Sequence, residues 1–123
     1  AIKSVFAGDR DTHTLIFDEI DAGISGRAAQ SVAEKLVAIS DSHQVICITH
    51  LAQIAAMADS HFMIEKSSDE ASTRTYIKKI DRDAQVMELA RLTGGSSITD
   101  SVKKSALEMK ELADTRKKDL RKA

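Results

Sequence analysis

The sequence predicts an α/β fold built around a parallel sheet, and three neighbouring segments carry this prediction. Two runs are apolar almost throughout, Thr14–Asp18 and residues 44–49, which is typical of parallel strands that are covered on both faces. Between them, Gly26–Ser40 has apolar residues at helical spacing. A strand, a helix and a strand within about 35 residues form a right-handed crossover by default, so we expect the two strands to pair in parallel.

Capping and turn residues mark the ends of the next elements. Residues 1–7 have helical spacing and are expected to be the end of a helix, followed by a turn over 8–11. Ser25 is a suitable N-cap for the helix over Gly26–Ser40. After the second strand, the alanine-rich segment 51–58 is expected to form a short helix.

The second half of the chain is expected to hold a hairpin and two helices. Residues 61–66 and 74–80, joined by a polar turn, favour an antiparallel hairpin at the edge of the sheet. Helices are expected over 84–93 and 99–121. Residues 94–97 are two glycines and two serines, and we interpret them as a helix C-cap and turn.

Composition limits the classes of function. The 123 residues, 42% of them hydrophobic, suffice for one small domain with its own core. A net charge of −1 and only one tyrosine and three phenylalanines argue against electrostatic DNA binding by the whole chain and against stacking on bases. The single cysteine, Cys47, excludes an intrachain disulfide and is expected to be a buried thiol. No apolar run approaches the roughly 18 residues of a membrane span, so we expect a cytoplasmic protein.

Two adjacent carboxylates, Asp18 and Glu19, end the first apolar run. Enzymes that transfer phosphoryl groups need one carboxylate to hold Mg²⁺ and another polar group to orient or deprotonate the attacking water. Adjacent residues of a strand point to opposite faces, so both acids can serve one site only at the tip of the strand, where open α/β sheets bind ligands. This pattern is typical of a Walker B strand.

A histidine, His50, follows the second apolar run, 32 positions (50 − 18) after Asp18. The carboxyl ends of parallel strands lie at one edge of a sheet, so we expect the imidazole beside the acid pair, within reach of a terminal phosphate or its water. A lone histidine after a strand is usually solvated or caps a helix. Its register with Asp18 and Glu19 favours the functional interpretation.

Together these segments resemble the C-terminal part of an ABC-type ATPase head. The run Asp-Glu-Ile-Asp-Ala-Gly-Ile-Ser-Gly at 18–26 is followed by an alanine-rich helix and by Ile-Thr-His-Leu-Ala-Gln-Ile-Ala-Ala-Met-Ala-Asp at 48–59. With Glu-Leu-Ala-Arg-Leu-Thr-Gly-Gly at 88–95, the chain is similar over essentially its whole length to the RecN family of bacterial SMC-like ATPases. That family acts in double-strand-break repair and recombination of DNA.

The resemblance implies roles for four residues. Asp18 would be the acid associated with Mg²⁺, directly or through water, and Glu19 the catalytic base. Asp21 would be the D-loop aspartate that contacts the opposite head, and His50 the switch histidine that senses the γ-phosphate. The implied cofactors are ATP and Mg²⁺. The implied partners are the N-terminal lobe of the same head, a second head in a homodimer, and DNA, in a nucleoid-associated protein without a membrane contact.

Two parts of such a head are missing from the sequence. No Gly-x-x-x-x-Gly-Lys-Ser/Thr loop is present to cradle phosphates, and the family's Ser-Gly-Gly-Glu signature does not occur. Residues 1–123 are therefore expected to be the C-terminal lobe of the head. We expect ATPase activity from the complete head and none from this chain alone.

Other interpretations of the same residues remain open. The chain could be a lobe of a different SMC-like chromosome or repair ATPase. It could be a metal-dependent nuclease that uses Asp18, Glu19 and Asp21, although no second acidic strand end is available to complete a two-metal site. It could also be a non-catalytic interaction module. The basic residues over 116–122 alternate with acids and are expected to form a solvated helix face rather than a DNA contact.

Overall fold

The computed structural model describes residues 13–20 and 22–122. The helix end expected over 1–7, the turn over 8–11 and Asp21 lie outside the described residues. The described part is a mixed α/β chain, as the sequence predicted. Its elements are, in order, β1 (Thr14–Asp18), α2 (Gly26–Ser40), β2 (Gln44–Ile48), α3 (Ala52–Ala56), β3 (Phe62–Ser68), β4 (Thr73–Lys79), α4 (Arg82–Gly94) and α5 (Asp100–Lys122).

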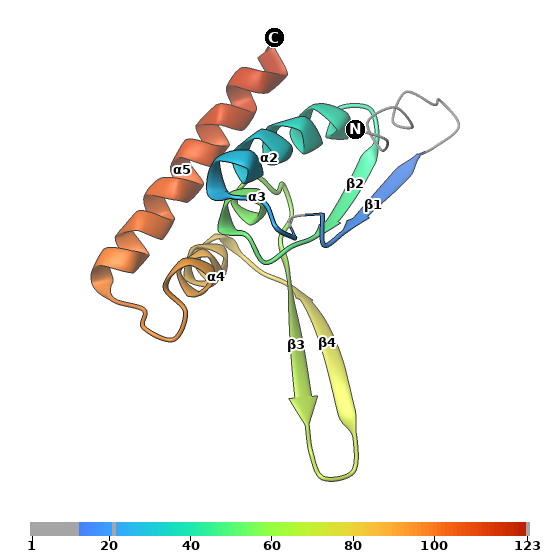
Figure 1. Cartoon of the computed structure of the whole chain (residues 1–123), viewed down its shortest axis with the longest axis vertical. Coiled ribbons are helices and arrows are strands. Elements are labelled where there is room, and N and C mark those ends of the chain that lie inside the picture. The colour runs from blue at the N-terminus through green and yellow to red at the C-terminus, as the bar shows by residue number, and fades with distance from the viewer. Residues whose placement is uncertain (1–12, 21, 123) are drawn as a thin grey trace.

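The first three elements form the predicted crossover. β1 and β2 pair in parallel and are joined through α2 (Figure 1). The register pairs Thr14 with Gln44 and Asp18 with Ile48, so the two strands begin and end side by side. α2 begins at the expected residue after Ser25, although the Ser25 side chain makes no capping hydrogen bond.

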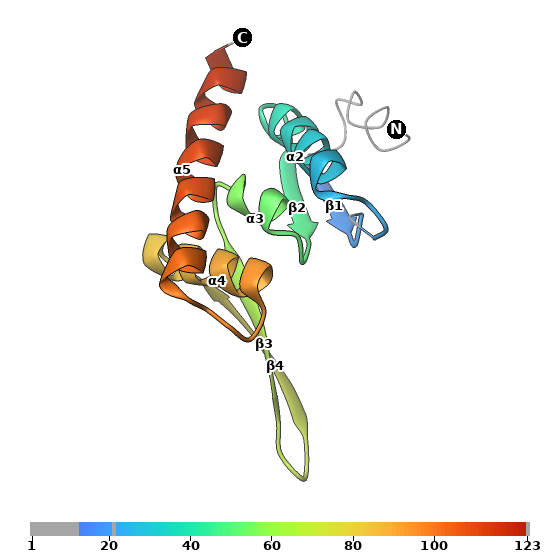
Figure 2. The same cartoon turned by 60° about the vertical axis from the view of Figure 1, so that its left-hand side comes forward.

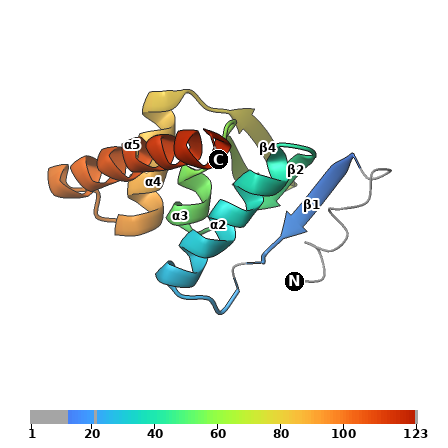
Figure 3. The same ribbon diagram turned by 90° about the horizontal axis from the view of Figure 1, so that it is seen from above.

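The described helices cover only one face of the β1–β2 sheet. Phe17 is buried, and Cys47 is partly buried on the same face, where both belong to the core around α2. On the other face, Ile16, Ile46 and Ile48 are 60%, 44% and 41% exposed. Figure 3 shows the helices together on one side of the two strands. The expectation that both faces of the sheet are covered is therefore wrong for the described residues. Apolar residues show that a strand can be buried on both faces, but they do not show which other elements are present to cover it.

The hairpin forms a sheet of its own. β3 and β4 pair antiparallel from Phe62 with Lys79 to Ser68 with Thr73, and the described strands form two separate sheets. The Asp69 carboxylate stabilises the turn by accepting hydrogen bonds from the backbone amides at 71 and 72. The hairpin projects away from the other elements (Figure 1) and is exposed along most of its length. Its predicted place at the edge of the first sheet is therefore wrong for the described residues.

The helices α3, α4 and α5 form a layer beside α2. The short α3 contacts each of the other three helices and lies between α2 and α5 in Figure 2. Its Ile54 belongs to a buried cluster with Leu89 of α4, which is fully buried, and with Ala106 and Ala113 of α5. None of the described helices is long and apolar enough to cross a lipid bilayer.

The boundaries of α4 follow from local chemistry. The Asp81 carboxylate accepts a hydrogen bond of 2.9 Å from the Ala84 amide, so α4 begins at Arg82, two residues before the expected start. Gly95 follows the helix with a φ of 64°, a conformation that favours glycine. The segment after α4 is therefore the turn that the sequence predicted.

Candidate active site at the strand ends

The predicted site lies where β1 and β2 end. Asp18 is the last residue of β1 and lies opposite Ile48, the last residue of β2. The Glu19 amide donates a hydrogen bond of 3.2 Å to the Ile48 carbonyl oxygen, which ties the two strand ends together. His50 follows Ile48 by two residues and, like Asp18 and Glu19, is exposed. The fold therefore brings three of the four predicted site residues to one edge of the sheet, and Asp21 lies outside the described residues.

Glu19 has an unusual backbone conformation. Its φ is 51°, which makes it the one non-glycine residue of the described chain in the left-handed region. Such a conformation costs an L residue roughly 1–2 kcal/mol and is concentrated at functional sites. The Ala22 amide donates to the Glu19 carbonyl oxygen at 3.3 Å, so the chain turns at this point. The extended backbone thus ends at Asp18, and the alternation that would send adjacent side chains to opposite faces stops before Glu19.

The backbone around His50 leads directly into a helix. The Thr49 hydroxyl accepts a hydrogen bond of 3.0 Å from the Leu51 amide. The Leu51 carbonyl oxygen then accepts from the Ile54 and Ala55 amides at 3.2 and 3.1 Å, which starts α3. Only Leu51 separates His50 from the first residue of α3. The position of the imidazole is therefore linked to the placement of this helix.

The site is an open edge rather than a closed pocket. Within residues 13–20 and 22–122, no three side chains of His, Cys, Asp or Glu gather closely enough to hold a metal ion. A groove of about 590 Å³ lies between α2 and α5, and none of Asp18, Glu19 and His50 lines it. The nuclease interpretation needs Asp21 as a third ligand, and this residue lies outside the described part.

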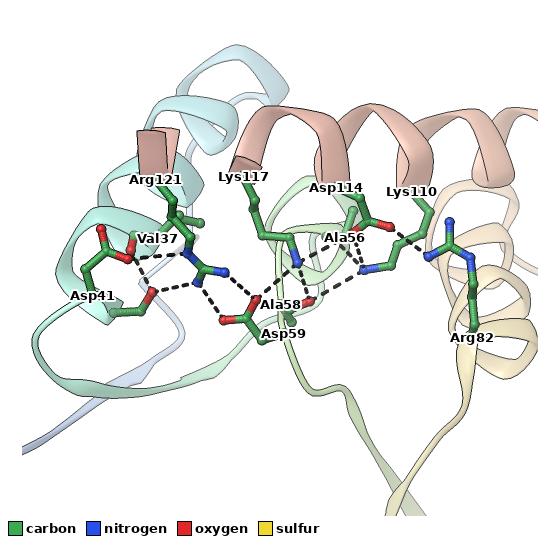
Figure 4. A network of polar contacts seen from close by, with 11 residues as sticks. Val37, Asp41, Ala56, Ala58, Asp59, Arg82, Lys110, Asp114, Lys117 and Arg121 are labelled. Carbon is green, nitrogen blue, oxygen red and sulfur yellow. Dashed lines mark hydrogen bonds and ion pairs between the residues drawn. The ribbon is translucent and has the colours of Figure 1, made fainter. Parts of the chain in front are cut away.

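A network of cations on α5 was missed by the sequence interpretation (Figure 4). The side chains of Lys110 and Lys117 are only 5% and 10% exposed, so the prediction of a solvated basic face is wrong for Lys117. The signal was present in the spacing of four charged residues at 110, 114, 117 and 121, which places them on one face of a helix. Several ion pairs bind α5 to the rest of the chain, among them Arg116 with Glu34 at 2.9 Å and Arg121 with Asp59 at 2.8 Å.

The carboxylates of this network are held in their charged form. Hydrogen bonding to the Arg121 guanidinium lowers the pKa of Asp59, with the charge of Lys117 acting in the same direction. Burial raises the pKa of Asp114, but hydrogen bonds to Arg82 and Lys110, together with the charges of Lys110 and Lys117, lower it overall. Both acids therefore remain available to pair with the buried lysines near neutral pH.

Comparison with known proteins identifies relatives over most of the chain. The DNA repair protein RecN of Bacillus subtilis is 45% identical over 114 residues, which are 93% of this chain and 20% of that protein. The chain is homologous to RecN. RecN of Vibrio cholerae is 41% identical over 109 residues, 89% of this chain and 20% of its own length. RecN of Deinococcus radiodurans is 42% identical over 97 residues, 79% of this chain and 17% of its own length.

The RecN resemblance stated from the sequence motifs is thereby confirmed. The chain spans about one fifth of the length of the curated RecN proteins that it matches. No protein-family model matches the chain. The roles of Asp18, Glu19, Asp21 and His50 stay predictions.

Proposed function

We propose that this chain supplies the Walker B strand, the D-loop and the switch histidine of an SMC-like ATPase head that acts in DNA repair. The observation that carries the proposal is the parallel register of β1 and β2, which brings Asp18, Glu19 and His50 to one edge of the sheet. The RecN relatives support it, because they are named as DNA repair proteins and match about nine-tenths of the chain.

The proposal includes a further lobe of the same head. The uncovered face of the β1–β2 sheet carries Ile16, Ile46 and Ile48, an apolar surface suited to packing against another layer. The sequence also has no glycine-rich phosphate loop, which a complete nucleotide site requires. In this view residues 1–123 are the C-terminal lobe, and an N-terminal lobe covers the open face and supplies the loop.

The residues at the strand ends suit a magnesium–nucleotide complex. Carboxylate oxygens are preferred ligands of Mg²⁺, and both acids are exposed at the ends of the strands. Asp18 would hold Mg²⁺, directly or through water, and the ion would supply positive charge beside the phosphates. Glu19 accepts a proton from the attacking water. His50 donates a hydrogen bond to the γ-phosphate, where negative charge grows during transfer.

The proposed cycle couples nucleotide to assembly. Asp21 in the D-loop contacts a second head, and two ATP molecules are bound between the heads. Binding of ATP docks the heads and hydrolysis releases them, which changes how the complete homodimer holds DNA.

The chain alone is expected to bind Mg-ATP weakly and not to hydrolyse it. Isothermal titration tests this, and sub-micromolar affinity of the isolated chain would contradict it.

The decisive experiment is Glu19→Gln in the complete protein. Glutamine keeps the size of the side chain but cannot accept the proton, so turnover should fall by roughly 10²-fold or more while ATP binding remains. Docked head dimers should then accumulate in sedimentation velocity runs with ATP. Glu70→Gln in the exposed β3–β4 turn is the control and should behave as the wild type. Unchanged turnover of the Glu19 variant would remove this residue from its proposed role.

A further inference from the structure

The helix that follows His50 is too short to hold its own position. α3 has five residues, and isolated helices of this length are not stable in water because nucleation is costly. Its Ala52, Ile54, Ala55 and Ala56 are all buried among neighbouring elements. Packing and the contacts at its ends must therefore fix where α3 lies, and with it the direction of the chain at His50.

Two buried lysines of α5 contact the last residue of α3 and the segment that directly follows it (Figure 4). The Lys110 ammonium donates to the Ala56 carbonyl oxygen at 3.0 Å and to the Ala58 carbonyl oxygen at 3.5 Å. The Lys117 ammonium donates to the same Ala58 oxygen at 3.1 Å. Carbonyls at the end of a helix lack intrahelical partners and carry partial negative charge, so cations stabilise them.

Acidic side chains hold the two ammonium groups in place. Asp114 lies 3.2 Å from Lys110 and 3.5 Å from Lys117, and Asp59 lies 3.3 Å from Lys117. Arg82 of α4 also contacts Asp114, at 2.7 Å. Burying charge is costly and adds little net stability compared with an apolar core, so stability alone does not explain this network.

We propose that Lys110 and Lys117 are positioning residues for His50. Lys110 holds the last residue of α3, and both lysines hold Ala58 just beyond it, while the hydrogen bond of the Leu51 amide joins the N-terminal end of the helix to Thr49. With one residue between His50 and α3, a shift of the helix moves the imidazole relative to Asp18 and Glu19. The ion pairs of Asp114 and Asp59 extend this link to α4 and to the segment before β3. The catalytic part of this inference rests on the proposed function, whereas the structural part does not.

The structural part is tested on the chain itself by NMR spectroscopy. Lys110→Met removes the charge at similar length, and it should shift the His50 ring and backbone signals and speed exchange of the α3 amides. Lys117→Gln, which keeps an N–H donor, is the milder variant and should shift the same signals less. Lys118→Met, at an exposed neighbouring position, is the control. Signals of His43 should not move in any variant whose circular dichroism is native. Unshifted His50 signals in a folded Lys110→Met chain would overturn the proposal.

The catalytic part is tested by a double-mutant cycle in the complete protein. Lys110→Met should lower kcat by roughly 10- to 100-fold, the range expected from a small misplacement of a catalytic group, with ADP affinity nearly unchanged. If Lys110 acts through His50, the double variant with His50→Ala should be no slower than His50→Ala alone. Additive losses, or equal losses of ADP affinity and kcat, would show a general structural role and overturn the proposal.

The same cycle separates failure of this inference from failure of the proposed function. An unchanged kcat in His50→Ala would remove the histidine from the proposed chemistry, and the effect of Lys110→Met on the His50 signals would then stand alone as a structural link. Loss of kcat in His50→Ala with additive effects of Lys110→Met would leave the proposed function intact and refute only the positioning role.

Discussion

Replacing Glu19 by glycine tests whether the chain stores strain at the proposed catalytic base. With a φ of 51°, Glu19 is in the left-handed region, which costs an L residue about 1–2 kcal/mol. Glycine avoids this cost but loses roughly 0.5–1 kcal/mol relative to alanine, because its unfolded chain has more freedom. Glu19→Gly should therefore be more stable than Glu19→Ala by up to about 1.5 kcal/mol, with a central value of about 0.75 kcal/mol. Both variants lack the carboxylate, so their difference isolates the backbone term.

The assay is urea unfolding followed by circular dichroism, with unchanged slopes as a check that the denatured states are comparable. Glu65 in β3 provides the matched control, because it is an exposed glutamate in regular extended backbone. At that position glycine should be less stable than alanine by roughly 0.5–1 kcal/mol. The sign of the glycine effect should thus reverse between the two sites. If the glycine variant is less stable than the alanine variant at both positions, the inference of strain at Glu19 is refuted.

Three further predictions concern the site, the core and one partly buried histidine. In the complete protein, His50→Ala should lower kcat strongly and change ADP affinity little. The control His13→Ala, before β1, should leave kcat unchanged. Equal effects of the two variants on kcat would contradict the switch role of His50. In the chain itself, Leu89→Ala should lower the free energy of unfolding by about 3–5 kcal/mol because Leu89 is fully buried, while Leu112→Ala, at 71% exposure, should change it by about 0.5 kcal/mol or less. Burial lowers the pKa of His61 below its usual 6.5, so the unfolded chain binds more protons as pH falls through that value. The stability of the wild type should therefore fall more than that of His61→Gln between about pH 8 and about pH 5, as measured by urea unfolding at each pH.

Local patterns were sufficient to predict most elements. The apolar runs at Thr14–Asp18 and residues 44–49 became β1 and β2 nearly residue for residue, because a short apolar segment between turn residues has few other stable conformations. The helix after Ser25 and the glycine turn after α4 were predicted for the same local reason. Within the site, the tip of each strand could be placed because parallel pairing brings the carboxyl ends of neighbouring strands together.

Features that depend on distant partners could not be predicted in this way. The hairpin has the expected strands, but its place depends on which strand edges are available to it. Lys110 and Lys117 are charged residues on a polar helix, and only their contacts with Ala56 and Ala58, more than 50 positions earlier in the chain, explain their burial. The left-handed conformation of Glu19 likewise has no mark in the sequence.

By itself, the sequence determined the α/β class, the β1–α2–β2 crossover and the resemblance to RecN, because these rest on local spacing and on motifs. The tertiary structure decided which face of the sheet is open, where the hairpin lies and how α5 holds the end of α3. Those outcomes depend on layers and charges that come into contact only in the folded chain. Two lysines can be buried only where carbonyl and carboxylate oxygens lie within contact distance of their ammonium groups.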